Sequence, residues 1–203
     1  MTRLEKLLLA GILVLVLLFG KTVMLDTQYH GFIGEPVQVN LASPKTITIS
    51  GIEGPVNATL LAEYTVDGVV KGKQRYSDYP SQISAYDFIM AWGDLPTKEV
   101  GNSVKYSQSV RWYYFRYFGD TPVTVDYISN HSANVHLIHQ NAVVLAQIKK
   151  VDKGDRVTLH GYLVNVAFEN GPWKSSLTRG DTGNGACEVM YVTAVTNSKG
   201  NPL

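Results

Sequence analysis

The feature that most constrains this chain is a run of fourteen uncharged, mostly apolar residues near its start, residues 7–20. Arg3 and Lys6 precede this run, and Lys21 follows it. A run of this length fits the apolar part of a signal peptide and is short for a membrane span. If the stem of Lys21 lies in the apolar layer while its ammonium group reaches water, the span extends to Leu25 and approaches the roughly 20 residues that a bilayer requires.

Two features favour a retained anchor over a cleaved signal peptide. Residues 21–25 contain neither a small-residue cleavage site nor a cysteine that could be lipidated. The basic residues before the run predict a cytoplasmic N-terminus. We therefore expect a cytoplasmic segment over residues 1–6, a transmembrane helix over residues 7–25, and the remaining chain outside the cytoplasm.

The rest of the chain is nearly neutral. Outside the first 21 residues it holds 15 basic and 16 acidic residues, so no general field attracts nucleic acid or an anionic membrane surface. Twelve tyrosines among many Thr and Val residues favour strands. The single cysteine, Cys187, excludes an intrachain disulfide. The sequence predicts a linker over residues 26–44, one β-rich domain over residues 45–197, and a loose tail over residues 198–203.

Most of this domain has the alternating pattern of strands. The Asp67-Gly68 pair between two such runs predicts a hairpin. The alternation shifts near Gly161, which predicts a bulge or a barrel corner. Residues 130–141 are polar and are expected to be irregular. The expected strands cover residues 37–41, 45–52, 59–66, 69–76, 104–118, 123–129, 156–168, 173–178 and 186–195.

Two segments have the spacing of helices. Apolar residues recur at helical intervals over residues 84–92 and 142–151, and Asn141 is placed to cap the second helix. Together with the strands, they predict a mainly β (α+β) domain, either a partly closed barrel or a sandwich. Residues 153–195 resemble part of an OB-type barrel, a likeness of fold that carries no function with it.

Cys187, the single cysteine, is the candidate nucleophile of a thiol enzyme. A thiol enzyme needs a thiolate, a histidine as its base and donors for an oxyanion. Cys187 follows a glycine-rich loop, and His131 and His136 are candidate bases in the polar segment before it. Arg179 is the candidate group for stabilising negative charge. The competing interpretation, favoured by the usual burial of free cysteine, is a small core residue at the start of a strand.

The histidines do not form a metal-binding signature. His131, His136 and His139 lie close together in the sequence, but the chain has no HExxH motif and no second cysteine. A zinc site requires at least three protein ligands in tetrahedral geometry. We expect neither a metal nor another cofactor.

The segment 111–118 reads RWYYFRYF and alternates aromatic and basic residues on both faces of a strand. Such a strand is expected to be covered on both sides. If it is exposed instead, Arg111, Trp112 and Arg116 form a stacking platform for glycan or single-stranded nucleic acid.

Four motifs carry a resemblance to known proteins: RW (111–112), NHSAN (130–134), SSLTR (175–179) and DTG with GACE (181–188). With the apolar run, they resemble uncharacterised bacterial single-pass membrane-anchored proteins. The resemblance covers roughly the C-terminal half of the chain and implies a bacterial setting without any catalytic residue. It places the anchor in the bacterial inner membrane. The remaining candidate binding residues lie in these motifs: Asn134, Asp181 and Glu188.

An anchor, a neutral β-rich domain and an incomplete catalytic set favour a non-enzymatic cell-envelope module that binds a protein or glycan partner. One alternative is a Cys187-dependent hydrolase or transpeptidase acting on envelope material. Another is an OB-like module that binds glycan or nucleic acid, although the charge makes nucleic acid the weaker choice. A Cys187 Sγ within hydrogen-bond reach of a histidine in an open cleft would favour the enzyme.

Overall fold

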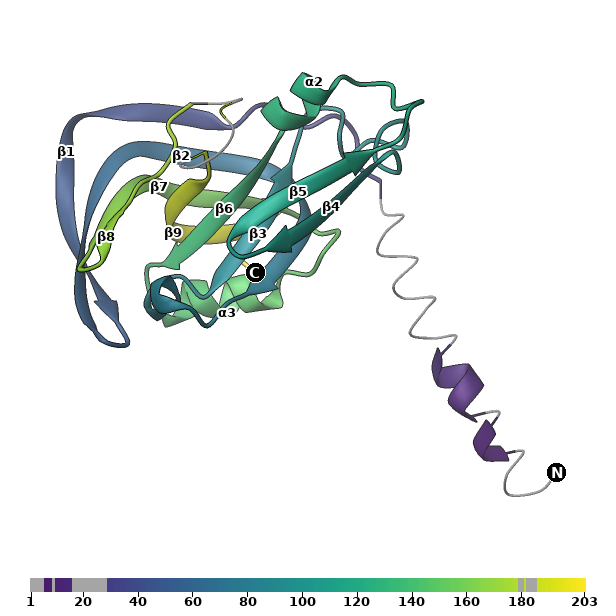
Figure 1. The fold of residues 1–203 in the computed structure, drawn as a ribbon, viewed down its shortest axis with the longest axis horizontal. Coiled ribbons are helices and arrows are strands. Elements are labelled where there is room, and N and C mark those ends of the chain that lie inside the picture. The colour runs from purple at the N-terminus through teal and green to yellow at the C-terminus, as the bar shows by residue number, and fades with distance from the viewer. Residues whose placement is uncertain (1–5, 9, 16–28, 179–180, 182–185) are drawn as a thin grey trace.

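The computed structural model describes residues 6–8, 10–15, 29–178, 181 and 186–203. It is mainly β, with 52% of the described residues in strands and few helices among them, as the sequence predicts (Figure 1). The strands are β1 (Val37–Gly51), β2 (Gly54–Arg75), β3 (Tyr86–Ala91), β4 (Val104–Ser109), β5 (Trp112–Tyr117), β6 (Ser132–His139), β7 (Arg156–Phe168), β8 (Gly171–Trp173) and β9 (Glu188–Asn197). Between the first and the last of these strands, the described helices are η1 (Tyr79–Gln82), α2 (Val125–Asn130) and α3 (Ala142–Lys150).

Five strands close into a barrel because the long strand β2 pairs along both of its edges. The order around the barrel is β2, β3, β6, β9, β7 and back to β2. All these pairs are antiparallel except β6 with β9, which is parallel. Strand β1 extends the sheet beside β2, and β8 extends it beside β7. A closed five-strand barrel excludes the sandwich and has the strand number of OB-type barrels.

The barrel interior holds the largest cluster of buried apolar side chains. Alternate residues of each strand point inward, including Tyr64 from β2, Phe88 from β3 and Leu137 from β6. Helix α3 closes one end of the barrel with Val144 and Ile148 in the same cluster. Burying each of these side chains contributes about 1.5–3 kcal/mol.

Helix α3 confirms the predicted second helix and its cap. The side chain of Asn141 accepts hydrogen bonds from the backbone N–H groups of Val143 and Val144, at 2.9 and 3.1 Å. These contacts satisfy two of the N–H groups that a helix start leaves without partners. The last turn carries Lys149 and Lys150, whose charges favour the negative end of the helix dipole.

The predicted irregularity at Gly161 is also confirmed. The pairing of β7 with β9 shifts between His160 and Gly161, and a Cβ atom at Gly161 would overlap the carbonyl oxygen of Tyr191. A glycine therefore lets two backbones approach where the sheet bends around the barrel.

Two predictions in the first half of the domain are wrong. Strand β2 runs straight through Asp67-Gly68, where a hairpin was expected, because pairing with β7 holds both residues in an extended strand. The predicted helix over residues 84–92 is strand β3. Its apolar residues serve both sheet faces, with Phe88 inside the barrel and Ile89 outside, and short apolar runs do not distinguish a buried strand from a helix.

Three predictions in the middle of the chain are also wrong. The expected single strand over residues 104–118 is the hairpin of β4 and β5. Most of the expected strand over residues 123–129 belongs to helix α2, which is capped by the side chain of Thr124. The expected irregular segment 130–141 contains β6, a central and almost wholly buried strand. Asn134 and His136 mask the strand pattern because they lie on the strand face that the β4–β5 hairpin covers, as described below.

The predicted transmembrane helix over residues 7–25 is not supported, so this part of the predicted fold is corrected. Among the described residues no helix is long and apolar enough to cross a membrane. The described helical residues near the start of the chain lie between positions 6 and 15. The extension through Lys21 lies outside the described residues.

Replacing Gly161 tests the barrel corner. Gly161→Ala should lower the free energy of unfolding by about 1–3 kcal/mol, because its methyl group forces the backbones of β7 and β9 apart. Chemical denaturation with circular dichroism measures this change. Gly119→Ala is the matched control, since a Cβ at Gly119 meets no atom within 4 Å. Equal stability of the two variants would contradict the close approach.

Candidate functional site

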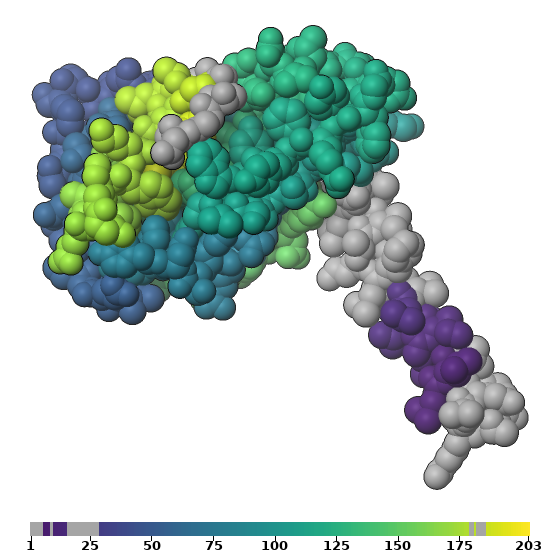
Figure 2. Space-filling model, viewed as in Figure 1, coloured from purple at the N-terminus to yellow at the C-terminus, as the bar shows by residue number. Residues whose placement is uncertain are grey.

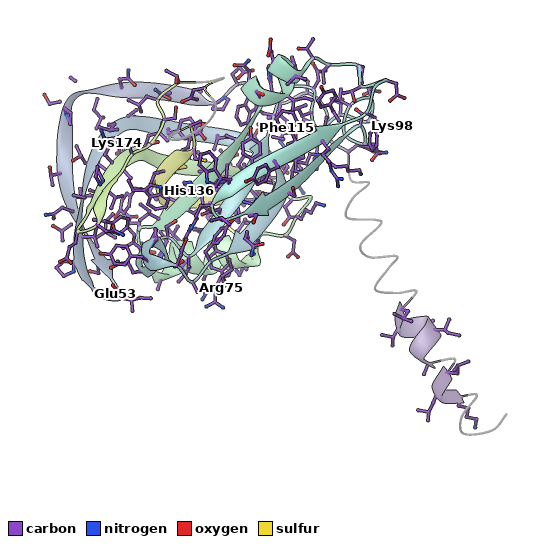
Figure 3. All side chains as sticks on the ribbon, viewed as in Figure 1. Glu53, Arg75, Lys98, Phe115, His136 and Lys174 are labelled. Carbon is purple, nitrogen blue, oxygen red and sulfur yellow. The ribbon has the colours of Figure 1, made fainter. Side chains whose placement is uncertain are left out.

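Strands β3 and β6 carry polar side chains on the face that points away from the barrel interior. Asp87 lies on β3, and Asn134 and His136 lie on β6. Their exposed fractions are 0%, 1% and 3%, because the β4–β5 hairpin lies across this face (Figure 1). Figure 3 labels His136 on this central part of the domain. The hairpin and the barrel thus enclose a polar layer.

Arg111, in the turn of the hairpin, holds this layer together. Its guanidinium donates to Asp87 Oδ1 at 2.7 Å and makes a two-pronged contact with Asp78, at 2.6 and 2.9 Å. It also donates to Ser81 Oγ and to the carbonyl oxygen of Ser84, each at 2.9 Å. One side chain of the hairpin therefore joins it to β3 and to the connection between β2 and β3.

The electrostatics of this arrangement follow from burial and charge. Burial opposes the charge on Arg111, but the hydrogen bonds and negative charges of Asp78 and Asp87 outweigh it and raise the Arg111 pKa. The hydrogen bonds from Arg111 lower the pKa of Asp78 to about 2. Asp78 therefore contributes to stability above its ordinary pKa, and this contribution is lost as the pH falls from about 4 to about 2.

Asp87 also contacts His136 on the neighbouring strand. His136 Nδ1 lies 2.8 Å from Asp87 Oδ2, a close polar contact without the alignment of a hydrogen bond. The imidazole lies beside the ring of Trp173, with 4.7 Å between ring centres. The Arg111 guanidinium in turn lies 4.2 Å from the centre of the Tyr76 ring, close enough for a cation–π contact.

The turn that presents Arg111 is strained. Val110 and Arg111 both have positive φ, at 50° and 68°, and they separate the paired residues Ser109 and Trp112. A two-residue turn with two positive φ values usually contains Asn and Gly, and a β-branched residue in this region is an outlier. The contacts of Arg111 hold the turn in this geometry, a form of strain that is often found at functional sites.

A cavity of about 300 Å³ lies beside the hairpin. The barrel, α2, the β5 strand and the segment before β9 surround it. In Figure 2 the teal side chains around the hairpin lie on the face of the domain that is turned to the viewer. Five aromatic residues line the cavity: Trp92, Trp112, Tyr113, Tyr114 and Phe115. Its described polar lining comprises Ser129, Ser132, Thr178, Asp181, Cys187 and Glu188.

A second cavity, of about 370 Å³, lies on the other side of Trp112 and Cys187, which line both cavities. Arg111 and His136 reach the second cavity from the polar layer, and Lys174 lines it from the segment after β8. Among the described residues, the first cavity is lined by the carboxylates of Asp181 and Glu188, whereas no carboxylate lines the second.

Cys187 lies in surroundings that favour the neutral thiol. Burial raises the pKa of its thiol to about 12, and the charges of Glu188, Asp87 and Asp181 add to this rise. Asn134 Nδ2 lies 4.0 Å from Cys187 Sγ and acts in the opposite direction. No contact between Sγ and a histidine is found among the described residues.

The other predicted catalytic residues do not gather around this thiol. His131 stacks on Tyr127 with 3.7 Å between ring centres, and its Nε2 lies 2.9 Å from Glu35 Oε1. It lines neither cavity. His136 shares the second cavity with Cys187 but is paired with Asp87. Arg179 lies outside the described residues. The catalytic roles stay predictions.

The predicted binding residues are separated by the fold. Arg111 lies in the polar layer with a side chain that is 12% exposed, whereas Arg116 is exposed on β5, so the two do not form one basic platform. Strand β5 is covered on one face only, because Trp112 and Tyr114 are 37% and 55% exposed. The prediction that both faces of this strand are covered is therefore wrong for the face that carries Trp112 and Tyr114. The proposed platform of Arg111 and Arg116 is absent from the described structure.

The remaining three binding candidates all lie near the cavities. Asn134 donates to the Arg111 carbonyl oxygen at 2.9 Å and supports the hairpin turn. Asp181 accepts a hydrogen bond from Ser176 Oγ at 2.6 Å and lines the aromatic cavity. Glu188 lines the same cavity and is 3% exposed.

Sequence reasoning missed several residues that build the site. Asp78 and Asp87 bind Arg111, and Trp92 and Trp173 line the two cavities. A usable signal was present for one of them, because Asp87 stands alone among apolar residues. Such a charge in a strand requires a partner on the covering layer.

No family model, curated protein or solved structure matches the chain. The resemblance to bacterial membrane-anchored proteins and the location outside the cytoplasm stay predictions. Among the described residues, no group of three or more His, Cys, Asp or Glu side chains is placed to hold a metal ion. The geometry of the two cavities and the polar layer therefore carries the functional argument.

The reactivity of Cys187 tests its environment. At about pH 7.5, iodoacetamide should alkylate the folded protein about a thousandfold more slowly than the unfolded protein. The reason is that a thiol pKa higher by about three units lowers the fraction of reactive thiolate about a thousandfold. Mass spectrometry measures both rates, and the rate for the folded protein should still be rising above pH 9. A rate that levels off near pH 8 would contradict the assigned environment.

Proposed function

We propose that this domain is a non-enzymatic binding module whose ligand occupies the aromatic cavity beside the β4–β5 hairpin. The cavity carries the proposal: about 300 Å³ lined by five aromatic residues and a small number of polar groups. Ligand sites in proteins have this size and composition, with aromatic area for affinity and a few polar groups for orientation.

Contacts within the described walls of the cavity support this proposal. Arg111 joins the hairpin to the barrel through its contacts with Asp78 and Asp87. Trp92 is 1% exposed, and its indole N–H donates to Glu35 Oε2 at 2.9 Å. A preformed cavity loses little conformational entropy on binding, which favours affinity.

The surroundings of Cys187 weigh against the thiol-enzyme alternative. A nucleophilic cysteine requires a lowered pKa and a base within reach. Here burial and acidic neighbours raise the pKa of Cys187, and Asn134 is the described polar side chain near Sγ. The same thiol suits an apolar wall between two cavities.

The separation of the two arginines weighs against an extended nucleic-acid platform. The guanidinium of Arg111 is committed to two carboxylates, and Arg116 stands apart from it on β5. The exposed rings of Trp112 and Tyr114 lie at the cavity instead of on a basic groove. A ligand that enters the cavity is therefore favoured over a strand that crosses the surface.

Filling the cavity tests the proposal. The neutral apolar dye phenylnaphthylamine should bind the wild-type protein with a rise in its fluorescence. Ser129→Phe should weaken this binding at least about tenfold, because its ring occupies space at the cavity wall. Ser50→Phe, on the exposed face of β1, should bind the dye like the wild type. Equal binding by both variants, with unchanged circular dichroism, would contradict a ligand site here.

A further inference from the structure

We infer that the ligand of the aromatic cavity carries a cationic group, and specifically an alkylated ammonium. This inference rests on the proposed function, because it assigns a chemical class to the ligand of that same cavity. Three properties of the described lining carry it: the sign of its charges, the number of its aromatic rings, and the contrast with the second cavity.

The charged side chains of the described lining are both acidic. Asp181 and Glu188 contribute carboxylates, and no lysine or arginine is found among the described lining residues. Their field reaches the other polar groups of the cavity. Burial is the largest cause that raises the pKa of the Cys187 thiol, and the charge of Glu188 is the next largest. Burial also raises the pKa of Tyr113, and the charges of Glu188 and Asp181 add to this rise. An anionic ligand would enter against this field.

The aromatic rings provide the complementary surface for a cation. The faces of Trp, Tyr and Phe rings carry negative charge density, so a cation placed over them is attracted, most strongly where water is excluded. Five such residues line a cavity that also holds two carboxylates. An alkylated ammonium matches both parts, since its methyl groups contact the rings and its charge faces Asp181 and Glu188.

The second cavity shows that this property is local. Across Trp112 and Cys187, no carboxylate is found among the described lining residues, which include Lys174 and the ion-paired Arg111. Among the described residues, the two carboxylates and the five aromatic residues that suit a cation therefore meet in the first cavity. We expect the charged group of the ligand to lie among Trp112, Tyr113 and Tyr114.

Two probes of equal shape and different charge test the inference. Choline and its neutral carbon analogue, dimethylbutanol, should be titrated into the full chain at constant ionic strength by isothermal titration calorimetry. Choline should bind at least about tenfold more tightly than the analogue, since only choline gains from the rings and carboxylates. Asp181→Asn and Tyr114→Leu should each weaken choline binding at least about fivefold.

Two variants outside the cavity serve as matched controls. Asp120→Asn removes an exposed carboxylate, and Tyr117→Leu removes an exposed ring from the same strand as Tyr114. Neither should change the affinity for choline. Choline binding that all four variants leave unchanged would place any choline site elsewhere and overturn the inference.

The outcomes separate this inference from the proposed function. If dimethylbutanol binds as tightly as choline, or choline does not bind at tens of millimolar, the cationic assignment is wrong. The proposed function then still stands if phenylnaphthylamine binds the wild type and not Ser129→Phe. If neither choline nor the dye recognises the cavity, both proposals fail.

Discussion

The carboxylate of Asp87 has no exposed surface and lies between the guanidinium of Arg111, at 2.7 Å, and the imidazole of His136, at 2.8 Å. A buried charge of this kind is costly unless it is paired, and removing one partner of such a pair costs about 3–5 kcal/mol. Because Arg111 belongs to the hairpin and Asp87 belongs to the barrel, this contact couples the placement of one to the folding of the other.

The shape of the aromatic cavity follows from that contact. Strand β5 begins directly after Arg111 and supplies Trp112, Tyr113, Tyr114 and Phe115 to the lining. The other end of the hairpin packs against α2 through a separate apolar cluster that includes Val104 and Ile128. The hairpin is thus fixed at a polar end and at an apolar end, and the cavity lies along the strand between them.

The strained turn has the same origin. The positive φ values of Val110 and Arg111 are unfavourable for these residue types, yet they direct the arginine side chain back into the polar layer. The hydrogen bonds of Arg111 compensate for this strain. Local preference alone would select a different turn.

Local patterns allowed much of the barrel to be predicted, and failed where distant contacts decide the structure. Strand β7, helix α3 with its Asn141 cap, and the bulge at Gly161 all have local signals in the sequence, and all three are found. Strand β6 was missed because Asn134 and His136 read as loop residues until the hairpin is placed over them.

The site could be predicted only in part, because some of its residues have a local signal and others depend on distant contacts. Sequence reasoning selected Arg111, Asn134, His136 and Cys187, and the fold brings these four residues together around the second cavity and its wall. It did not select Asp87, because its role depends on a contact with a residue 24 positions away. The expected membrane span is not supported, because no helix among the described residues is long and apolar enough to cross a membrane.

Native-state hydrogen exchange tests most directly whether the buried ion contact holds the hairpin on the barrel. The backbone amides of β4 and β5 should be followed by NMR in the wild type and in Arg111→Met, with the amides of α3 and β7 as internal references. We expect the hairpin amides of the variant to exchange at least about a hundredfold faster while the reference amides keep most of their protection. Unchanged protection in the hairpin, or an equal loss throughout the domain, would contradict this account.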